Sequence, residues 1–168
     1  MLIVPRLFVE GLMSSEDYYL RPFYASFLRA LRIMAFIVTI YLPGAYVALQ
    51  LYHQEMIPTV LLVSAAASRE GVPLHITIET ILLIIALELT KESGLRLPKN
   101  IGSTVTIFGA LVIGQAAVQA GLVSAPTIIL VSVTALAEFI ISQLSEGIVV
   151  YRLLVTMLGG LFGIYGVV

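Results

Sequence analysis

Long apolar runs separated by short polar segments dominate the chain. Residues 33–51 carry no charge, and later apolar runs cover residues 74–90, 101–123, 127–141 and 148–168. A helix needs about 20 apolar residues to cross a bilayer, and continuous runs of this kind are typical of membrane helices rather than of the alternating strands of a barrel. The pattern therefore predicts an all-α, polytopic transmembrane helical bundle with about four to five spans.

A cluster of polar residues follows the first apolar run, at positions 52–58. An apolar run over residues 57–67 comes next, and a polar turn containing Gly71 and Pro73 follows it. This run is too short to span a bilayer, so we expect a re-entrant or interfacial helix in addition to the spans. Polar residues at a membrane edge mark the place where a regular crossing ends. The members of this cluster that we single out are His53, Gln54, Glu55 and Pro58.

The first part of the chain has a different character. Aromatic and basic residues alternate between positions 18 and 32, as expected for a helix that lies among lipid headgroups. We divide the chain into a juxtamembrane or interfacial segment, 1–32, and a membrane domain, 33–168. A plain anchor fits the first segment, and a gating linker is the alternative.

Composition agrees with the pattern and excludes other classes. The chain is 60% hydrophobic and 11% charged, with a mean hydropathy of +1.06, whereas a soluble domain has roughly 25% charged residues. A net charge of −1 argues against a nucleic-acid partner. The chain contains no cysteine, which excludes disulfides, thiolate metal ligands and cysteine nucleophiles.

Basic residues predict the sidedness of the chain. With the N-terminus on the cytoplasmic side, eight of the nine Lys and Arg residues fall inside, and only Arg69 falls outside. Because positive residues favour the cytoplasmic side, we predict a cytoplasmic N-terminus. The polar cluster at 52–58 and the short helix after it then lie at the outer face.

Four polar residues inside apolar runs are candidates for function. Gln115 and Gln119 are four positions apart and share one helix face, where they could line an ion path or hold two helices together. Glu79 and Glu138 could belong to an ion path, or could reach the interface with their carboxylates.

No pattern in the chain predicts catalysis. His53 and Glu55 are two residues with ligand chemistry, but a metal site needs three or four ligands, so a local cap or ion pair is the preferred interpretation. The sequence has no Ser/His/Asp set, phosphate-binding loop or zinc spacing. We therefore expect no enzymatic activity, no cofactor and no metal.

A series of motifs carries a resemblance to a known family. Ser-Glu-Asp-Tyr-Tyr at 15–19 is followed by the polar cluster at 52–58, by Arg-Glu-Gly-Val-Pro at 69–73 and by Gly-Ala-Leu-Val-Ile-Gly-Gln-Ala-Ala-Val at 109–118. In this order the series resembles the membrane domain of the GerA-type spore germination receptor A subunit. The same domain is shared with a stage V sporulation protein of the AF type.

The resemblance implies a protein of the spore inner membrane that acts in nutrient-triggered germination. It implies B and C subunits as partners, and assembly into an oligomeric, ligand-gated ion channel or a signal-relaying subunit. It also implies that the chain is a fragment of a longer protein whose N-terminal soluble domain is missing here. A non-conducting structural membrane scaffold is the alternative. A secondary transporter is weaker, because we find no internal repeat between the two halves.

Overall fold

All regular structure in the described part of the chain is helical. The computed structural model describes residues 21–95, 99–141 and 145–168. Its α-helices are α2 (Pro22–Tyr52), α3 (Thr59–Arg69), α4 (Ile76–Leu95), α5 (Lys99–Gln119), α6 (Ala125–Ile140) and α7 (Ser145–Phe162), and its 3₁₀ turns are η2 (Gln54–Met56) and η3 (Gly163–Gly166). The all-α prediction is therefore confirmed for these residues.

Helix α2 runs without a break through the boundary that we predicted at residue 32. Pro22 stands in its first turn, where a missing N–H costs nothing, and no Gly or Pro follows before Pro43. The residues on both sides of position 32 are thus parts of one continuous helix. The assignment of residues 1–32 to a juxtamembrane segment stays a prediction, and residues 1–20 lie outside the described residues.

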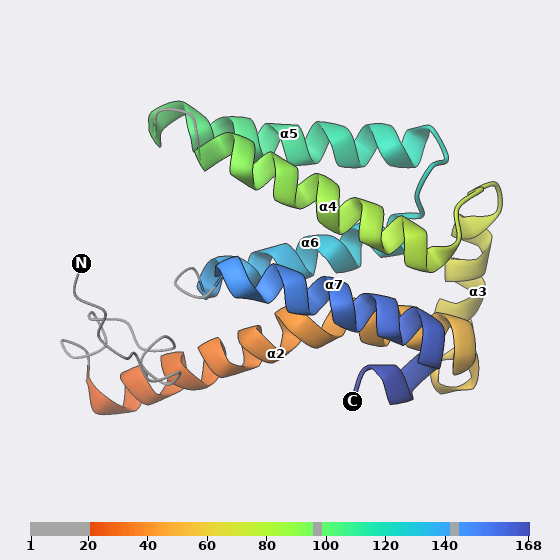
Figure 1. Ribbon diagram of the computed structural model, residues 1–168, viewed down its shortest axis with the longest axis horizontal. Coiled ribbons are helices and arrows are strands. Elements are labelled where there is room, and N and C mark those ends of the chain that lie inside the picture. The colour runs from red at the N-terminus through yellow and green to blue at the C-terminus, as the bar shows by residue number, and fades with distance from the viewer. Residues whose placement is uncertain (1–20, 96–98, 142–144) are drawn as a thin grey trace.

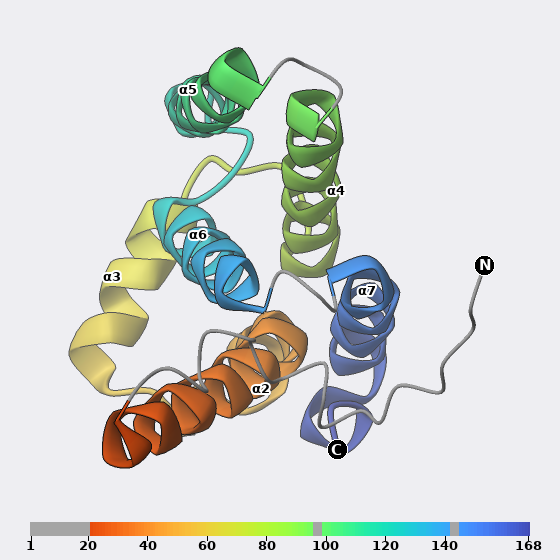
Figure 2. The ribbon, with the colours of Figure 1, turned by 90° about the vertical axis from the view of Figure 1, so that its left-hand side faces the viewer.

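The long helices alternate in direction, and α3 lies across one end of them (Figures 1 and 2). The last residues of α2 and the first residues of α4 lie at the end of the bundle that α3 crosses. The last residues of α4 and the first residues of α5 lie at the opposite end. Gly71 has a φ of 102°, which allows the sharp turn from α3 towards α4. The short helix predicted at 57–67 is present as α3, and its position at a membrane interface stays a prediction.

Two glycines bring α2 and α7 into backbone contact. A Cβ atom built on Gly159 would lie 2.7 Å from the carbonyl oxygen of Gly44, and one built on Gly44 would lie 2.8 Å from the carbonyl oxygen of Val155, so neither position has room for a side chain. The Tyr52 hydroxyl lies 3.1 Å from the carbonyl oxygens of both Gly160 and Leu161, and its one proton is shared between them. Gly44 and Gly159 therefore allow α2 and α7 to pack closely against each other within the chain.

The other helices surround this pair. Helix α6 packs on α2 and α4, and α4 contacts α5, α6 and α7. Helix α5 packs mainly along α4 and lies at the edge of the bundle (Figure 2). One face of α5 is therefore left without cover among the described residues.

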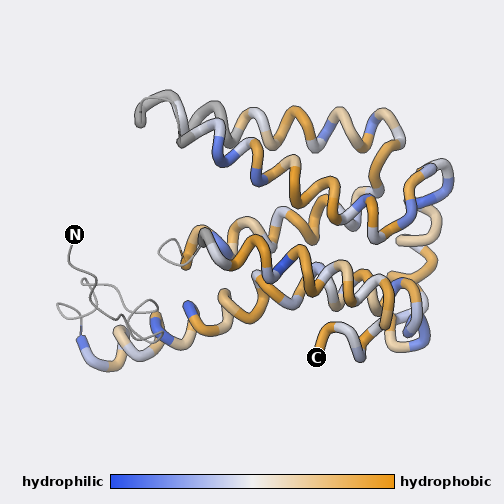
Figure 3. The backbone as a smooth tube through the Cα atoms, in the orientation of Figure 1, coloured by the Kyte–Doolittle hydropathy of each residue, from blue (hydrophilic) through white to orange (hydrophobic). Residues whose placement is uncertain are grey.

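The surface of this bundle is apolar and its interior holds charge. Exposed hydrophobic side chains cover the helices, for example Ile129, Leu136 and Leu161 at 64–66% exposure, and Figure 3 shows the hydrophobic stretches along the helices. Glu79 and Arg152 are fully or almost fully buried. A protein that folds in water has the reverse arrangement, whereas a bundle in lipid turns charged groups inward.

Fewer described helices have the length and composition of a membrane span than the sequence pattern predicts. Two described helices, at 22–52 and 147–166, are long and apolar enough to cross a membrane by length and composition. The apolar helices Thr59–Arg69, Phe108–Gln119 and Ala125–Ile140 are shorter. The prediction of four to five spans is therefore not confirmed.

Candidate functional site: two buried charge clusters

Four charged side chains form a closed ring between three helices. Glu88 and Lys91 come from α4, Glu138 from α6 and Arg152 from α7. Lys91 Nζ lies 2.9 Å from Glu88 Oε2 and 2.7 Å from Glu138 Oε2. Arg152 Nη1 donates to Glu138 Oε2 at 2.8 Å, and Arg152 Nη2 donates to Glu88 Oε2 at 3.2 Å. We call these four residues the charge ring.

The charge ring is neutral and graded in burial. Two carboxylates face two cations, and the exposed fraction of the side chain falls from 33% at Glu88 and 15% at Lys91 to 4% at Glu138 and 2% at Arg152. A charge without a partner in an apolar interior costs several kcal/mol, and pairing lowers that cost. The ring thus opens towards the surface on its α4 side and is closed on its α7 side.

Glu79 is held differently, near the opposite end of α4. Its side chain has no exposed area, and its Oε1 accepts hydrogen bonds from the Ser124 backbone N–H at 2.7 Å and from the Ser124 hydroxyl at 2.8 Å. Its Oε2 lies 3.3 Å from Nη1 of Arg69, the last residue of α3. A buried carboxylate needs such donors, because it can only accept hydrogen bonds. We call Glu79, Arg69, Ser124, Thr127 and Tyr46 the Glu79 site.

The hydroxyl groups of the Glu79 site have a defined direction. The Ser124 hydroxyl donates its hydrogen bond to Glu79. The Thr127 hydroxyl, 2.8 Å from Ser124 Oγ, must therefore donate to Ser124. The Tyr46 hydroxyl lies 3.4 Å from Thr127 and is left to donate to it. A chain of hydrogen bonds therefore runs from Tyr46 on α2 through Thr127 and Ser124 to the Glu79 carboxylate on α4.

Local sequence places Ser124 at this point. Gly121, with a φ of 65°, ends α5: its N–H donates to the Val118 carbonyl, and the N–H of Leu122 donates to the Ala117 carbonyl. This paired pattern with glycine in the left-handed region is the Schellman motif. Ser124 then precedes α6 as its N-cap, but its hydroxyl accepts no hydrogen bond from a backbone N–H of that helix. Its hydroxyl goes to Glu79 instead.

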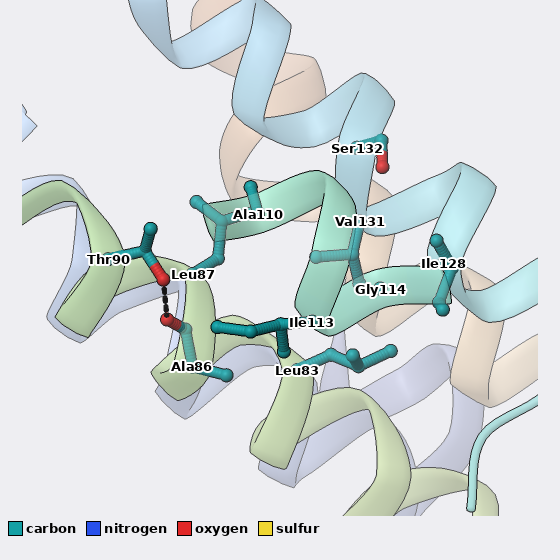
Figure 4. Close-up of a pocket in the computed structure, with 10 residues that line it drawn as sticks. All are labelled: Leu83, Ala86, Leu87, Thr90, Ala110, Ile113, Gly114, Ile128, Val131 and Ser132. Carbon is teal, nitrogen blue, oxygen red and sulfur yellow. Dashed lines mark hydrogen bonds between the residues drawn. The ribbon is translucent and has the colours of Figure 1, made fainter. Parts of the chain in front are cut away.

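Gln115 and Gln119 lie apart from both clusters, on exposed positions of α5. They line a groove of about 770 Å³ between α4, α5 and α6, whose walls are mainly apolar and which also reaches Lys91. A smaller void of about 60 Å³ adjoins the groove, and Figure 4 shows its lining, with the Thr90 hydroxyl bonded to the Ala86 carbonyl at 2.7 Å. The amides thus face an open apolar groove, and their role in an ion path stays a prediction.

The polar cluster at 52–58 closes α2. The backbone N–H of His53 donates to the Leu49 carbonyl, and Gln54 Nε2 donates to the Gln50 carbonyl at 2.8 Å. Glu55 and Pro58 are exposed, and Pro58 immediately precedes α3. Within the described residues, no group of three His, Asp or Glu side chains that could hold a metal ion is found. The motif therefore forms the turn between α2 and α3, and any further role for it stays a prediction.

Sequence reasoning singled out both buried carboxylates but did not find their partners. Glu138 and Arg152 are 14 positions apart, whereas Glu88 and Arg152 are 64 apart. The two members of each pair lie on different helices, so no periodicity within one helix relates them. One signal was present: Arg152 lies in an apolar stretch, where a charge requires an opposite charge nearby in the fold.

Comparisons with known proteins support one family. The model of the Bacillus/Clostridium GerA spore germination protein family matches residues 1–168. The chain is 46% identical over 165 residues to the uncharacterized membrane protein YfkQ of Bacillus subtilis, covering 97% of this chain and 32% of that protein. It is 44% identical over 169 residues to spore germination protein KA of the same organism, covering 99% of this chain and 31% of that protein.

A third relative comes from another species. Spore germination protein GerLA of Bacillus cereus is 43% identical over 170 residues, covering 99% of this chain and 34% of that protein. The chain thus spans about a third of the length of these relatives. No solved structure matches significantly. The match over all 168 residues places the chain in the GerA family of spore germination proteins.

Proposed function

We propose that this chain is the membrane part of the A subunit of a germinant receptor and acts in nutrient-triggered spore germination. The observation that carries the proposal is the family match over residues 1–168, together with relatives named spore germination proteins. The apolar surface and charged interior support a location in a membrane. In the proposal this is the spore inner membrane, with the N-terminus on the cytoplasmic side, and B and C subunits are the partners.

For the mechanism, we propose an oligomeric ion channel in which α5 lines the pore. The support is that Gln115 and Gln119 are exposed on an apolar helix that packs mainly on α4. An amide facing hydrocarbon leaves its hydrogen bonds unmade, whereas an amide facing a water-filled path does not. A signal-relaying subunit would use the same face without conduction.

A non-conducting scaffold is the second candidate, and one observation favours it. The charge ring is internally paired, so it offers no free charge to a passing ion. In a scaffold, Gln115 and Gln119 would bond to a neighbouring helix as packing contacts. The two candidates therefore differ in whether the amides contact water or protein.

The test uses spores that carry the full-length receptor subunit containing this segment. Replacing Gln115→Leu and Gln119→Leu together should abolish nutrient-triggered potassium release while the amount of protein, measured by immunoblot, stays the same. The matched control is Val112→Leu, at an exposed position of α5 that does not line the groove. Unchanged release in the double variant would reject the pore and favour the scaffold.

A complementation experiment tests the germination role itself. Spores lacking the full-length gene receive either that gene or this chain alone. Restoration of release by the complete gene supports the receptor role, and the second arm shows whether the described domain is sufficient. If deletion of the gene leaves release intact, the receptor role is wrong.

A further inference from the structure

A second pocket lies at the end of the bundle that α3 crosses. It has a volume of about 440 Å³ and is bounded by the end of α2, by α3 and by the start of α4. Small-molecule sites typically measure about 300–1,000 Å³ and combine apolar walls with a few placed polar groups. The walls here include Leu62 and Ala66, and the polar groups are Gln50, Gln54, Arg69 and His75.

The polar lining is rich in donors and has no negative charge. Among the described residues that line the pocket, none is acidic. Arg69 provides a guanidinium, His75 an imidazole, and Gln50 and Gln54 two amides. Gln54, in η2, uses one amide N–H on the last turns of α2, since its Nε2 donates to the Gln50 carbonyl at 2.8 Å. A ligand here would therefore meet hydrogen-bond donors and a guanidinium that is 22% exposed and pairs with Glu79 through Nη1.

The protein does not saturate the donors of Arg69. Its Nη2 donates to the Leu74 carbonyl at 3.4 Å, and its Nη1 lies 3.3 Å from Glu79. Charge-assisted hydrogen bonds measure about 2.7–2.9 Å, so both contacts are long. Nη1 is buried and makes no hydrogen bond to a described residue. A guanidinium has five N–H groups in a planar fork, which suits a carboxylate or phosphate.

We propose that this pocket binds a small oxyanion, a carboxylate or a phosphate group attached to a short apolar body. The oxyanion bonds to the guanidinium of Arg69 and to His75, and the apolar body lies against Leu62 and Ala66. The source is either a soluble molecule or the headgroup of a lipid, because the two offer the same chemistry. The site goes beyond the proposed function, since binding is a property of the chain and needs no conduction.

The experiment measures binding of butyrate to the purified chain in phosphatidylcholine nanodiscs, by saturation-transfer NMR. Butyrate carries a carboxylate on a short apolar body, and propylammonium is the probe of similar size and opposite charge. We expect saturation transfer to butyrate and none to propylammonium. The same experiment in nanodiscs that contain phosphatidylglycerol tests the lipid source, because a bound lipid phosphate would displace butyrate.

Two neighbouring alanines of α3 give a matched pair of variants. Ala66→Leu fills the pocket and should weaken butyrate binding at least about tenfold, a difference well within the range of such titrations. Ala67→Leu adds the same side chain at an exposed position that does not line the pocket, and binding should not change. Arg69→Lys keeps a cation beside Glu79 but removes the fork, so it should also weaken binding.

Several results would overturn the proposal. The first is equal loss of binding in Ala66→Leu and Ala67→Leu. The second is equal binding of propylammonium and butyrate. The third is the absence of butyrate binding together with phosphatidylglycerol retention that does not depend on Ala66.

Circular dichroism at 222 nm checks that each variant keeps its helices. If Arg69→Lys loses helicity, the alanine pair decides the outcome, since both positions are exposed. Displacement of butyrate by phosphatidylglycerol in the wild type but not in Ala66→Leu supports the site with a lipid as its source.

Discussion

The two charge clusters solve the same problem with different partners. Glu138 in the charge ring is neutralised by Lys91 and Arg152, so two full charges from two other helices compensate it. Glu79 has one cation at 3.3 Å and takes its short hydrogen bonds from Ser124, at 2.7 and 2.8 Å. The first arrangement depends on charge balance, and the second depends mainly on dipoles and hydrogen-bond geometry.

This difference predicts how each cluster responds to a single substitution. Removal of one member of a balanced ring leaves a net buried charge, which is the costly outcome for an ion pair. Removal of one donor from Glu79 leaves other donors in place, so the loss is closer to that of one hydrogen bond. The charge ring should therefore behave as one unit, and the Glu79 site as separable contacts.

The largest effect is expected for Arg152→Met. The variant leaves two carboxylates beside one lysine in a site where Arg152 is 2% exposed, and should lower the free energy of unfolding by about 3–5 kcal/mol. The measurement is unfolding in mixed detergent and dodecyl sulfate micelles, followed by circular dichroism. Arg152→Met combined with Glu138→Gln restores charge balance and should recover part of the loss. A double variant less stable than the single one would show that the ring is not a unit.

A smaller effect is expected for Glu79→Gln. The amide oxygen still accepts from Ser124, while Arg69 loses its partner but is 22% exposed and can be solvated. The free energy of unfolding should fall by about 1–3 kcal/mol, measured in the same micelles. Glu70→Gln, at an exposed position just after α3, is the control and should change stability little. A loss as large as that of Arg152→Met would remove the distinction between the clusters.

The smallest effects test the direction of the hydrogen-bond chain from Tyr46 to Glu79. Ser124→Ala removes one of two short bonds to Glu79 and should cost about 1 kcal/mol. Tyr46→Phe removes only the first donor of the hydrogen-bond chain, which lies 3.4 Å from the Thr127 hydroxyl. It should lower the free energy of unfolding by less than Ser124→Ala does. The same unfolding measurement ranks the two variants. If Tyr46→Phe cost more than Ser124→Ala, Tyr46 would have a partner other than Thr127.

The sequence predicted the helices better than the contacts between them. Each long helix of the described residues contains most of one of the predicted apolar runs, because long continuous apolar runs are typical of helices rather than of alternating strands. Their ends moved: the run at 101–123 became α5, which ends at Gln119 because Gly121 begins a Schellman turn. The glycine was visible in the sequence, but its φ of 65° was not.

The buried charges show where sequence reasoning stops. Glu79 and Glu138 were recognised as unusual, and their positions in apolar runs were sufficient for that. The partner of Glu79, Ser124, is 45 positions away and reads locally as an ordinary helix N-cap. Only the packing of α4 against α6 turns its hydroxyl towards the carboxylate. Long-range pairing of this kind depends on the tertiary fold, for which one sequence has no periodic signal.

The contact between α2 and α7 sets an order on biogenesis. Tyr52 and the Gly160 carbonyl are 108 positions apart, and α7 is the last long helix of the described chain. During synthesis, the surface of α2 at Gly44 stays uncovered until α7 has been made, because synthesis proceeds from the N-terminus. Helix α2 is therefore synthesised well before the helix that covers it. A chain that ends before α7 lacks Val155 and Gly159, the residues that pack on Gly44.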